Sequence, residues 1–84
     1  MEQSTRLFKI DNSVTVKAYF YEFKKHLEQL DLVRQNSRGV FDRSVNEVMA
    51  PNHVKGLLAA AKTLIMDPKA VSVKTDSGLT LTRV

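Results

Sequence analysis

The sequence predicts an α+β fold in which about three helices pack on a small antiparallel sheet that includes a C-terminal β-hairpin. Three features support this: alternation around residues 76–78, a helical repeat after Pro51, and a helical stripe within residues 13–32. The 84 residues suffice for a single small domain, 1–84. Such a domain buries only roughly 60% of its unfolded surface, so a homodimer would add stability.

The N-terminal third supports two interpretations, and a strand over Thr5–Ile10 belongs to both. In the favoured one, a long helix runs from about Ser13 to Leu32 with a cap from residues 11–13. Large apolar residues recur there at helical spacing. They are Val16, Phe20, Phe23, Leu27 and Leu30.

Alternation over residues 14–20 supports the other interpretation of this third. Residues 11–13 would then form the loop of a first hairpin, and the helix would begin only near Tyr21. Whether residues 13–20 are helix or strand stays open at this point.

The middle of the chain predicts two helices separated by a short break. A short one is expected over Asp42–Met49 with Asp42 as its cap, after a turn at residues 37–39. A longer one begins at Pro51, which suits a first helical turn, and ends at Asp67 because Pro68 follows. Its expected core-facing residues are Val54, Leu57, Leu58, Ala61, Leu64 and Ile65, and its expected outward residues are Asn52, Lys55, Gly56, Ala59, Lys62 and Thr63.

The C-terminal end predicts a β-hairpin with a three-residue loop at residues 76–78. Gly78 tolerates the left-handed conformation that such a loop needs at its last position. This register pairs Thr75 with Leu79 and Val73 with Leu81.

The order of these elements resembles a winged helix-turn-helix. Residues 44–49 and 53–64 correspond to the paired helices, residues 50–52 to their tight turn, and residues 71–82 to the wing. The resemblance implies a DNA-binding fold with the second helix as its recognition helix. This resemblance rests on the order of the elements. The wing carries Asp76 at its tip, and the recognition helix that the resemblance implies contains no arginine.

Charge and composition favour a non-enzymatic binding module. Thirteen Lys and Arg against nine Asp and Glu give a net charge of +4, which suits a polyanionic partner. The leading expectation is a small DNA-binding transcription regulator that contacts duplex DNA through the 51–66 helix. The expected nucleic-acid contacts are Arg34, Arg38, Arg43, Asn52, Lys55, Lys62 and Lys74. The alternative interpretation is that these residues belong to a solvated surface of mixed charge.

The alternative function is a protein-binding adaptor or inhibitor, of the small phage or plasmid type, that docks on a host protein. Tyr19 and Tyr21 are its expected anchors, because exposed tyrosines favour protein interfaces. Near lysines, they also stack on single-stranded bases. Gly56 and Ala59 would let a partner helix, an element of the same domain or a second copy approach closely.

Several classes of function are disfavoured by the sequence. No catalytic, metal or cofactor site is expected, because the chain has no cysteine, its two histidines lie in separate elements, and its three glycines are far apart. No membrane partner is expected, since the longest apolar stretch, residues 54–66, contains two lysines, and no signal peptide is expected at the N-terminus. The absence of cysteine fits a reducing cytoplasm, so we expect a cytoplasmic protein.

Overall fold

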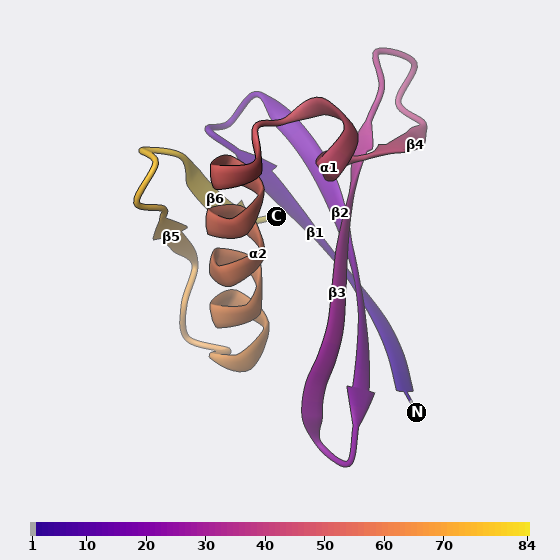
Figure 1. The fold of residues 1–84 in the computed structure, drawn as a ribbon, viewed down its shortest axis with the longest axis vertical. Coiled ribbons are helices and arrows are strands. Elements are labelled where there is room, and N and C mark those ends of the chain that lie inside the picture. The colour runs from indigo at the N-terminus through magenta and orange to yellow at the C-terminus, as the bar shows by residue number, and fades with distance from the viewer. Residues whose placement is uncertain (1) are drawn as a thin grey trace.

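The computed structural model describes residues 2–84, with side chains described from residue 4 onward, and these residues form six strands and two helices. The strands are β1 (Glu2–Ile10), β2 (Val14–Phe23), β3 (His26–Gln35), β4 (Phe41–Ser44), β5 (Ser72–Lys74) and β6 (Thr80–Arg83), and the helices are α1 (Val45–Val48) and α2 (Pro51–Met66). The strands form one antiparallel sheet in the order β4-β3-β2-β1-β6-β5 (Figure 1). β4 and β5 are therefore its opposite edges.

Helix α2 lies against one face of this sheet (Figure 1). It contacts β3 on one side and β5 and β6 on the other, although β2 and β1 lie between them in the sheet. The sheet therefore curves around α2, and the helix occupies its concave side. Apolar side chains from both layers form the core between them. The largest fully buried ones are Phe8, Val16, Leu32, Leu57, Leu64 and Leu81.

The prediction of about three helices on a small sheet is wrong. The described chain is mostly sheet, with one main helix and a second helix of four residues. The winged helix-turn-helix arrangement fails with it, because residues 13–32 supply two long strands where that architecture needs its first helix.

The expected helix from Ser13 to Leu32 is instead a β-hairpin formed by β2 and β3. Its first half is rich in β-branched and aromatic residues, which favour strands. The aromatic cluster at residues 19–23 cannot share one stripe of a helix. A strand resolves this conflict, since alternation places Phe20 in the core and Tyr19 and Tyr21 on the opposite face.

The other interpretation of the N-terminal third is confirmed for its first hairpin only. Residues 11–13 form the loop between β1 and β2, where Ile10 pairs with Val14. The helix that this interpretation placed near Tyr21 is wrong as well, because β2 continues to Phe23. The turn that follows is made by Lys24 and Lys25.

This second turn carries no signal in the sequence. Lys24 and Lys25 have φ angles of 49° and 70°, both in the left-handed region. Two-residue hairpin turns with two positive φ angles favour Asn-Gly, and a pair of lysines does not predict one. The hairpin therefore depends on its strands pairing on either side of an unfavourable turn.

The short helix predicted over Asp42–Met49 is wrong at its start. Residues 41–44 form β4, and α1 covers only Val45–Val48. Ser44 caps this helix in place of Asp42, because its Oγ accepts a hydrogen bond of 3.2 Å from the Asn46 N–H. The Asp42 carboxylate accepts a bond of 2.6 Å from the amide of Asn36.

Helix α2 is confirmed from Pro51 to Met66, with Asp67 as its C-cap. Its buried residues are Val54, Leu57, Ala60, Ala61 and Leu64, while Leu58 and Ile65 pack at the margin of the core. The Arg83 guanidinium donates to the carbonyl of Leu64 in the last turn of the helix and to those of Asp67 and Pro68 just beyond it. Among residues 2–84, no helix combines the length and the apolar character that crossing a membrane requires.

The predicted C-terminal hairpin is confirmed in its register. Val73 pairs with Leu81, and the Thr75 N–H donates to the Leu79 carbonyl at 2.6 Å. Gly78 closes the loop at a φ of 91°. The buried Thr75 hydroxyl accepts a second bond of 3.1 Å from the Leu79 N–H, so the loop is held by both backbone and side chain.

Candidate functional site

The face of the sheet opposite α2, here called the open face, is left uncovered by the helices. Along β2, Val16, Ala18 and Phe20 are buried beneath α2, while Lys17 and Tyr19 between them remain partly exposed. Such alternation is typical of an antiparallel sheet with one face in solvent. Side chains on the open face are therefore available to a partner.

Aromatic rings and a lysine lie together on the open face. Tyr19 and Tyr21 are two residues apart on β2 and point the same way. Phe41 joins them from β4, with the Lys17 Nζ 4.6 Å from the centre of its ring. The same Nζ lies 5.9 Å from the centre of the Tyr19 ring, so one cation contacts two aromatic faces.

The neighbouring strand β1 continues this surface. Leu7 pairs with Lys17 and remains 40% exposed on this face. Lys9 pairs with Thr15 and is exposed. The open face thus combines aromatic, aliphatic and cationic groups along two adjacent strands.

One acidic side chain interrupts this surface. Asp31 on β3 pairs directly with Tyr19 and is partly buried. A carboxylate at this position repels a polyanion, so the open face is less favourable to phosphate than its lysines alone indicate.

The three predicted arginines come together at one corner of the sheet. Arg34 on β3 pairs with Arg43 on β4, and Arg38 lies in the loop between these strands. All three are exposed. Arg34 pairs on its other side with the buried Val16, and paired residues lie on the same face of a sheet. Arg34 and Arg43 therefore face the side of the sheet that carries the helices.

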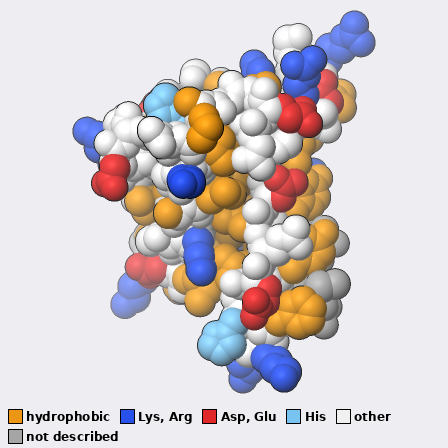
Figure 2. All heavy atoms as spheres, in the orientation of Figure 1, with side chains coloured by type: hydrophobic (Ala, Val, Ile, Leu, Met, Phe, Trp, Pro, Cys, Tyr) orange, Lys and Arg blue, Asp and Glu red, His pale blue; other side chains and the backbone are white. Residues whose placement is uncertain are grey.

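The remaining predicted nucleic-acid residues lie elsewhere. Asn52, Lys55 and Lys62 are exposed on α2, while Lys74 is on β5, at the edge of the sheet opposite Arg43 on β4. On the face that carries α2, the Lys and Arg side chains lie at several separate places with acidic groups between them (Figure 2). The fold therefore gathers the arginines but does not join them to the lysines in one patch.

Gly56 packs against an element of the same chain. A Cβ atom built there would lie 3.1 Å from the Cβ of Thr75, in the loop after β5. The glycine thus allows α2 to pack closely against Thr75. Ala59, one turn further along α2, is exposed, and its role in an interface stays a prediction.

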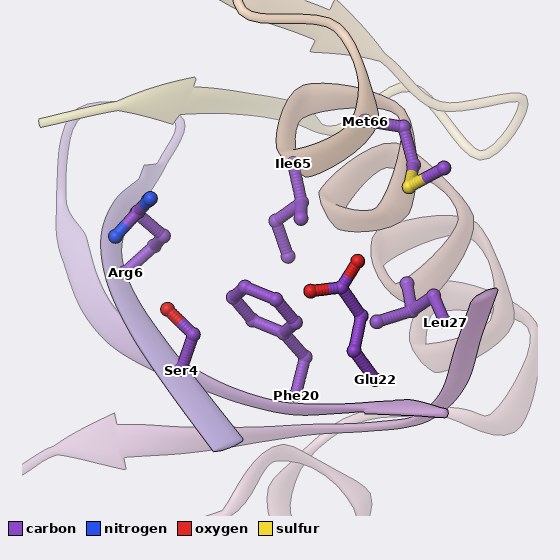
Figure 3. Close-up of a pocket in the computed structure, with 7 residues that line it drawn as sticks. All are labelled: Ser4, Arg6, Phe20, Glu22, Leu27, Ile65 and Met66. Atoms are coloured by element: carbon purple, nitrogen blue, oxygen red, sulfur yellow. The ribbon is translucent and has the colours of Figure 1, made fainter. Parts of the chain in front are cut away.

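A cleft of about 660 Å³ opens between the sheet and the C-terminal turn of α2 (Figure 3). It is lined by Ser4, Arg6, Phe20, Glu22, Leu27, Ile65 and Met66. Arg6 and Glu22 lie on opposite sides of the Phe20 ring (Figure 3). The lining contains one hydroxyl, that of Ser4, and no histidine. No three His, Cys, Asp or Glu residues of the described chain are grouped to hold a metal.

No protein-family model, curated protein or solved structure significantly matches this chain. Sequence reasoning identified Tyr19 and Tyr21 but missed Lys9, Lys17 and Phe41. The signal that could have found Lys17 is the alternation over residues 14–20, which places it beside Tyr19 once the segment is taken as a strand. Phe41 could not be found this way, because it comes from a different strand.

Proposed function

We propose that this chain is a non-enzymatic binding module that holds single-stranded nucleic acid on the open face. The observation that supports this most is the placement of Tyr19 and Tyr21 on one uncovered face together with Lys17 and Lys9. Aromatic rings on an exposed sheet provide stacking platforms for bases, and flanking lysines neutralise the phosphates. The net charge of +4 adds long-range attraction to a polyanion.

The chemistry of the open face fits a single strand better than a duplex. In a duplex the bases are stacked on each other, so their ring faces are not accessible to tyrosine. An extended single strand presents these faces, and stacking on aromatic side chains tolerates any base. Binding of this kind is expected to show little sequence preference and a strong dependence on salt.

Duplex recognition by α2 remains a separate proposal with weaker support. Its exposed face offers Asn52, Lys55 and Lys62, and the sheet curves around the helix on both sides. The variant Lys55→Glu/Lys62→Glu tests it, because both side chains are exposed and the fold is expected to survive. Unchanged duplex affinity in this variant would remove α2 from nucleic-acid binding.

A protein partner is the second candidate, and the same surface favours it. Tyrosines and an exposed leucine are common anchors at protein interfaces, and Leu7 lies beside Lys17 on the open face. An adaptor that docks on a larger host protein would use this face without any requirement for its lysines. The two functions are therefore separated by their dependence on charge.

The test is fluorescence anisotropy of labelled single-stranded and duplex oligonucleotides at two salt concentrations. We expect single-strand binding that weakens steeply with salt. In Tyr19→Ala/Tyr21→Ala, each lost stacking contact should weaken binding roughly 5- to 150-fold, the equivalent of about 1–3 kcal/mol per base. The matched control, Tyr19→Phe/Tyr21→Phe, keeps both rings and should bind nearly as well as the wild type.

Two results would contradict the proposal. One is the absence of single-strand binding at low salt, which would direct attention to a protein partner captured through the same tyrosines. The other is equal affinity of the alanine and phenylalanine variants, since this would show that the rings do not contact the bases.

A further inference from the structure

Arg34 and Arg43 form a like-charged pair across two strands. They are direct partners in the antiparallel register of β3 and β4. Side chains directly opposite each other in a sheet lie close together, and like charges in this arrangement are destabilising. Neither arginine forms a hydrogen bond or an ion pair with any described residue of the chain. Among the described residues, no ion pair offsets this repulsion.

The carboxylate that lines this corner, that of Asp42, is bound by another group. A hollow of about 300 Å³ at this corner is lined by both arginines together with Asn36, Ser37 and Asp42. The Asn36 Nδ2 donates to the Asp42 Oδ2 at 2.6 Å. The Asp42 carboxylate lies in the hollow and opposes an anion there, but it forms no ion pair with either arginine.

The loop around the hollow is held by its own hydrogen bonds. The Asn36 Oδ1 accepts from the N–H groups of Arg38 and Val40 at 2.9 and 3.0 Å. The Gln35 side chain donates to the Gly39 carbonyl at 2.7 Å. The hollow is therefore built on an ordered loop, and an incoming ligand does not have to order it.

We infer that this hollow is an anion site in which a phosphate group bridges the guanidinium groups of Arg34 and Arg43. Each guanidinium presents several donors in a planar fork, which matches two oxygens of a phosphate. The Ser37 hydroxyl lines the same hollow and supplies a further donor. The bound phosphate would relieve the repulsion between the two arginines, so binding and stability are coupled.

This site deepens the proposed function in one respect, which rests on that proposal. The pairing of β3 and β4 shifts register between Arg34 and Gln35, so β4 carries Phe41 on the open face and Arg43 towards the opposite side. A single strand that crosses Tyr19 and Phe41 would reach the edge of the sheet at β4 and could place a backbone phosphate between the arginines. The same chemistry would also take a free phosphate or a small phosphate ester.

The first experiment measures thermal unfolding with inorganic phosphate as the probe, against chloride at matched ionic strength. Phosphate should raise the Tm of the wild type. Arg43→Gln should lose this response, and in chloride it should melt roughly 1–8 °C above the wild type because the like-charged pair is gone. Arg43→Lys keeps the charge and loses the fork, so it should gain no stability in chloride and bind phosphate about tenfold more weakly.

The control is Arg6→Gln, which removes the same charge from β1 and should keep the full phosphate response. If phosphate raised the Tm of the wild type by no more than it raised the Tm of Arg43→Gln, the inference would be overturned. Arg43 is exposed, so these variants are expected to fold, and circular dichroism verifies this.

The source of the phosphate is decided by oligonucleotide titrations with the same variants. If the site takes a backbone phosphate, Arg43→Gln will weaken single-strand binding and reduce its salt dependence. If it takes free phosphate, Arg43→Gln will keep its affinity for the oligonucleotide while losing the phosphate response. Tyr19→Ala/Tyr21→Ala should retain that response, so failure of the open face and failure of the anion site are distinguishable.

Discussion

The turn between β2 and β3 should become more stable when Lys24-Lys25 is replaced by Asn-Gly. Both lysines adopt positive φ angles, 49° and 70°. The left-handed conformation is disfavoured by roughly 1–2 kcal/mol for a residue with a Cβ atom, and asparagine and glycine adopt it more readily. Glycine also loses more entropy on folding, by roughly 0.5–1 kcal/mol relative to alanine.

From these terms we expect Lys24→Asn/Lys25→Gly to gain about 1–2 kcal/mol in the free energy of unfolding. For a domain of this size, that corresponds to a Tm increase of roughly 4–16 °C. Urea denaturation followed by circular dichroism measures the free energy, and a thermal scan measures the Tm.

The matched control is Lys24→Gln/Lys25→Gln. It removes the same two charges but keeps side chains that disfavour positive φ. If the glutamine variant were as stable as the Asn-Gly variant, relief of charge repulsion would explain the gain and the argument from backbone conformation would be refuted.

Three further changes test other parts of the structure. Gly56→Ala should lower stability by about 1 kcal/mol in urea denaturation, because overpacking against the held Thr75 side chain outweighs a gain of roughly 1 kcal/mol in helix propensity; a higher Tm would contradict this. Arg83→Met should lower the free energy of unfolding by about 2 kcal/mol, since it removes the cation that binds carbonyls at and just beyond the C-terminal end of α2, and no change would show that water satisfies them equally well. Asp31→Asn should strengthen single-strand binding about two- to fivefold in anisotropy titrations, equivalent to about 0.4–1 kcal/mol for an unfavourable charge near the surface; weaker binding would place the strand elsewhere.

Local sequence signals determined α2 and the C-terminal hairpin. Pro51 and the Asp67-Pro68 pair mark the ends of α2, and its apolar repeat identifies the buried face. Gly78 with alternation on both sides fixes the last hairpin and its register. These elements were predictable because each depends on the backbone preferences of a few neighbouring residues.

The N-terminal half was decided by pairing between distant residues. The spacing of apolar residues in 16–30 suits a helix, but the sheet buries Val16 and Phe20 against α2 and leaves Tyr19 on the open face. Both patterns are present locally, and pairing decides between them, since the backbone hydrogen bonds of β2 are formed with β1 and β3 together.

The candidate site follows the same division. The sequence alone placed Tyr19 and Tyr21 outside the core, where both are partly exposed, and the three arginines close together along the chain. Only the tertiary structure placed Phe41 against Lys17 and made Arg34 and Arg43 direct partners. The physical reason is that a surface formed by several strands depends on sheet order and register, and these are set by contacts between residues far apart in the chain.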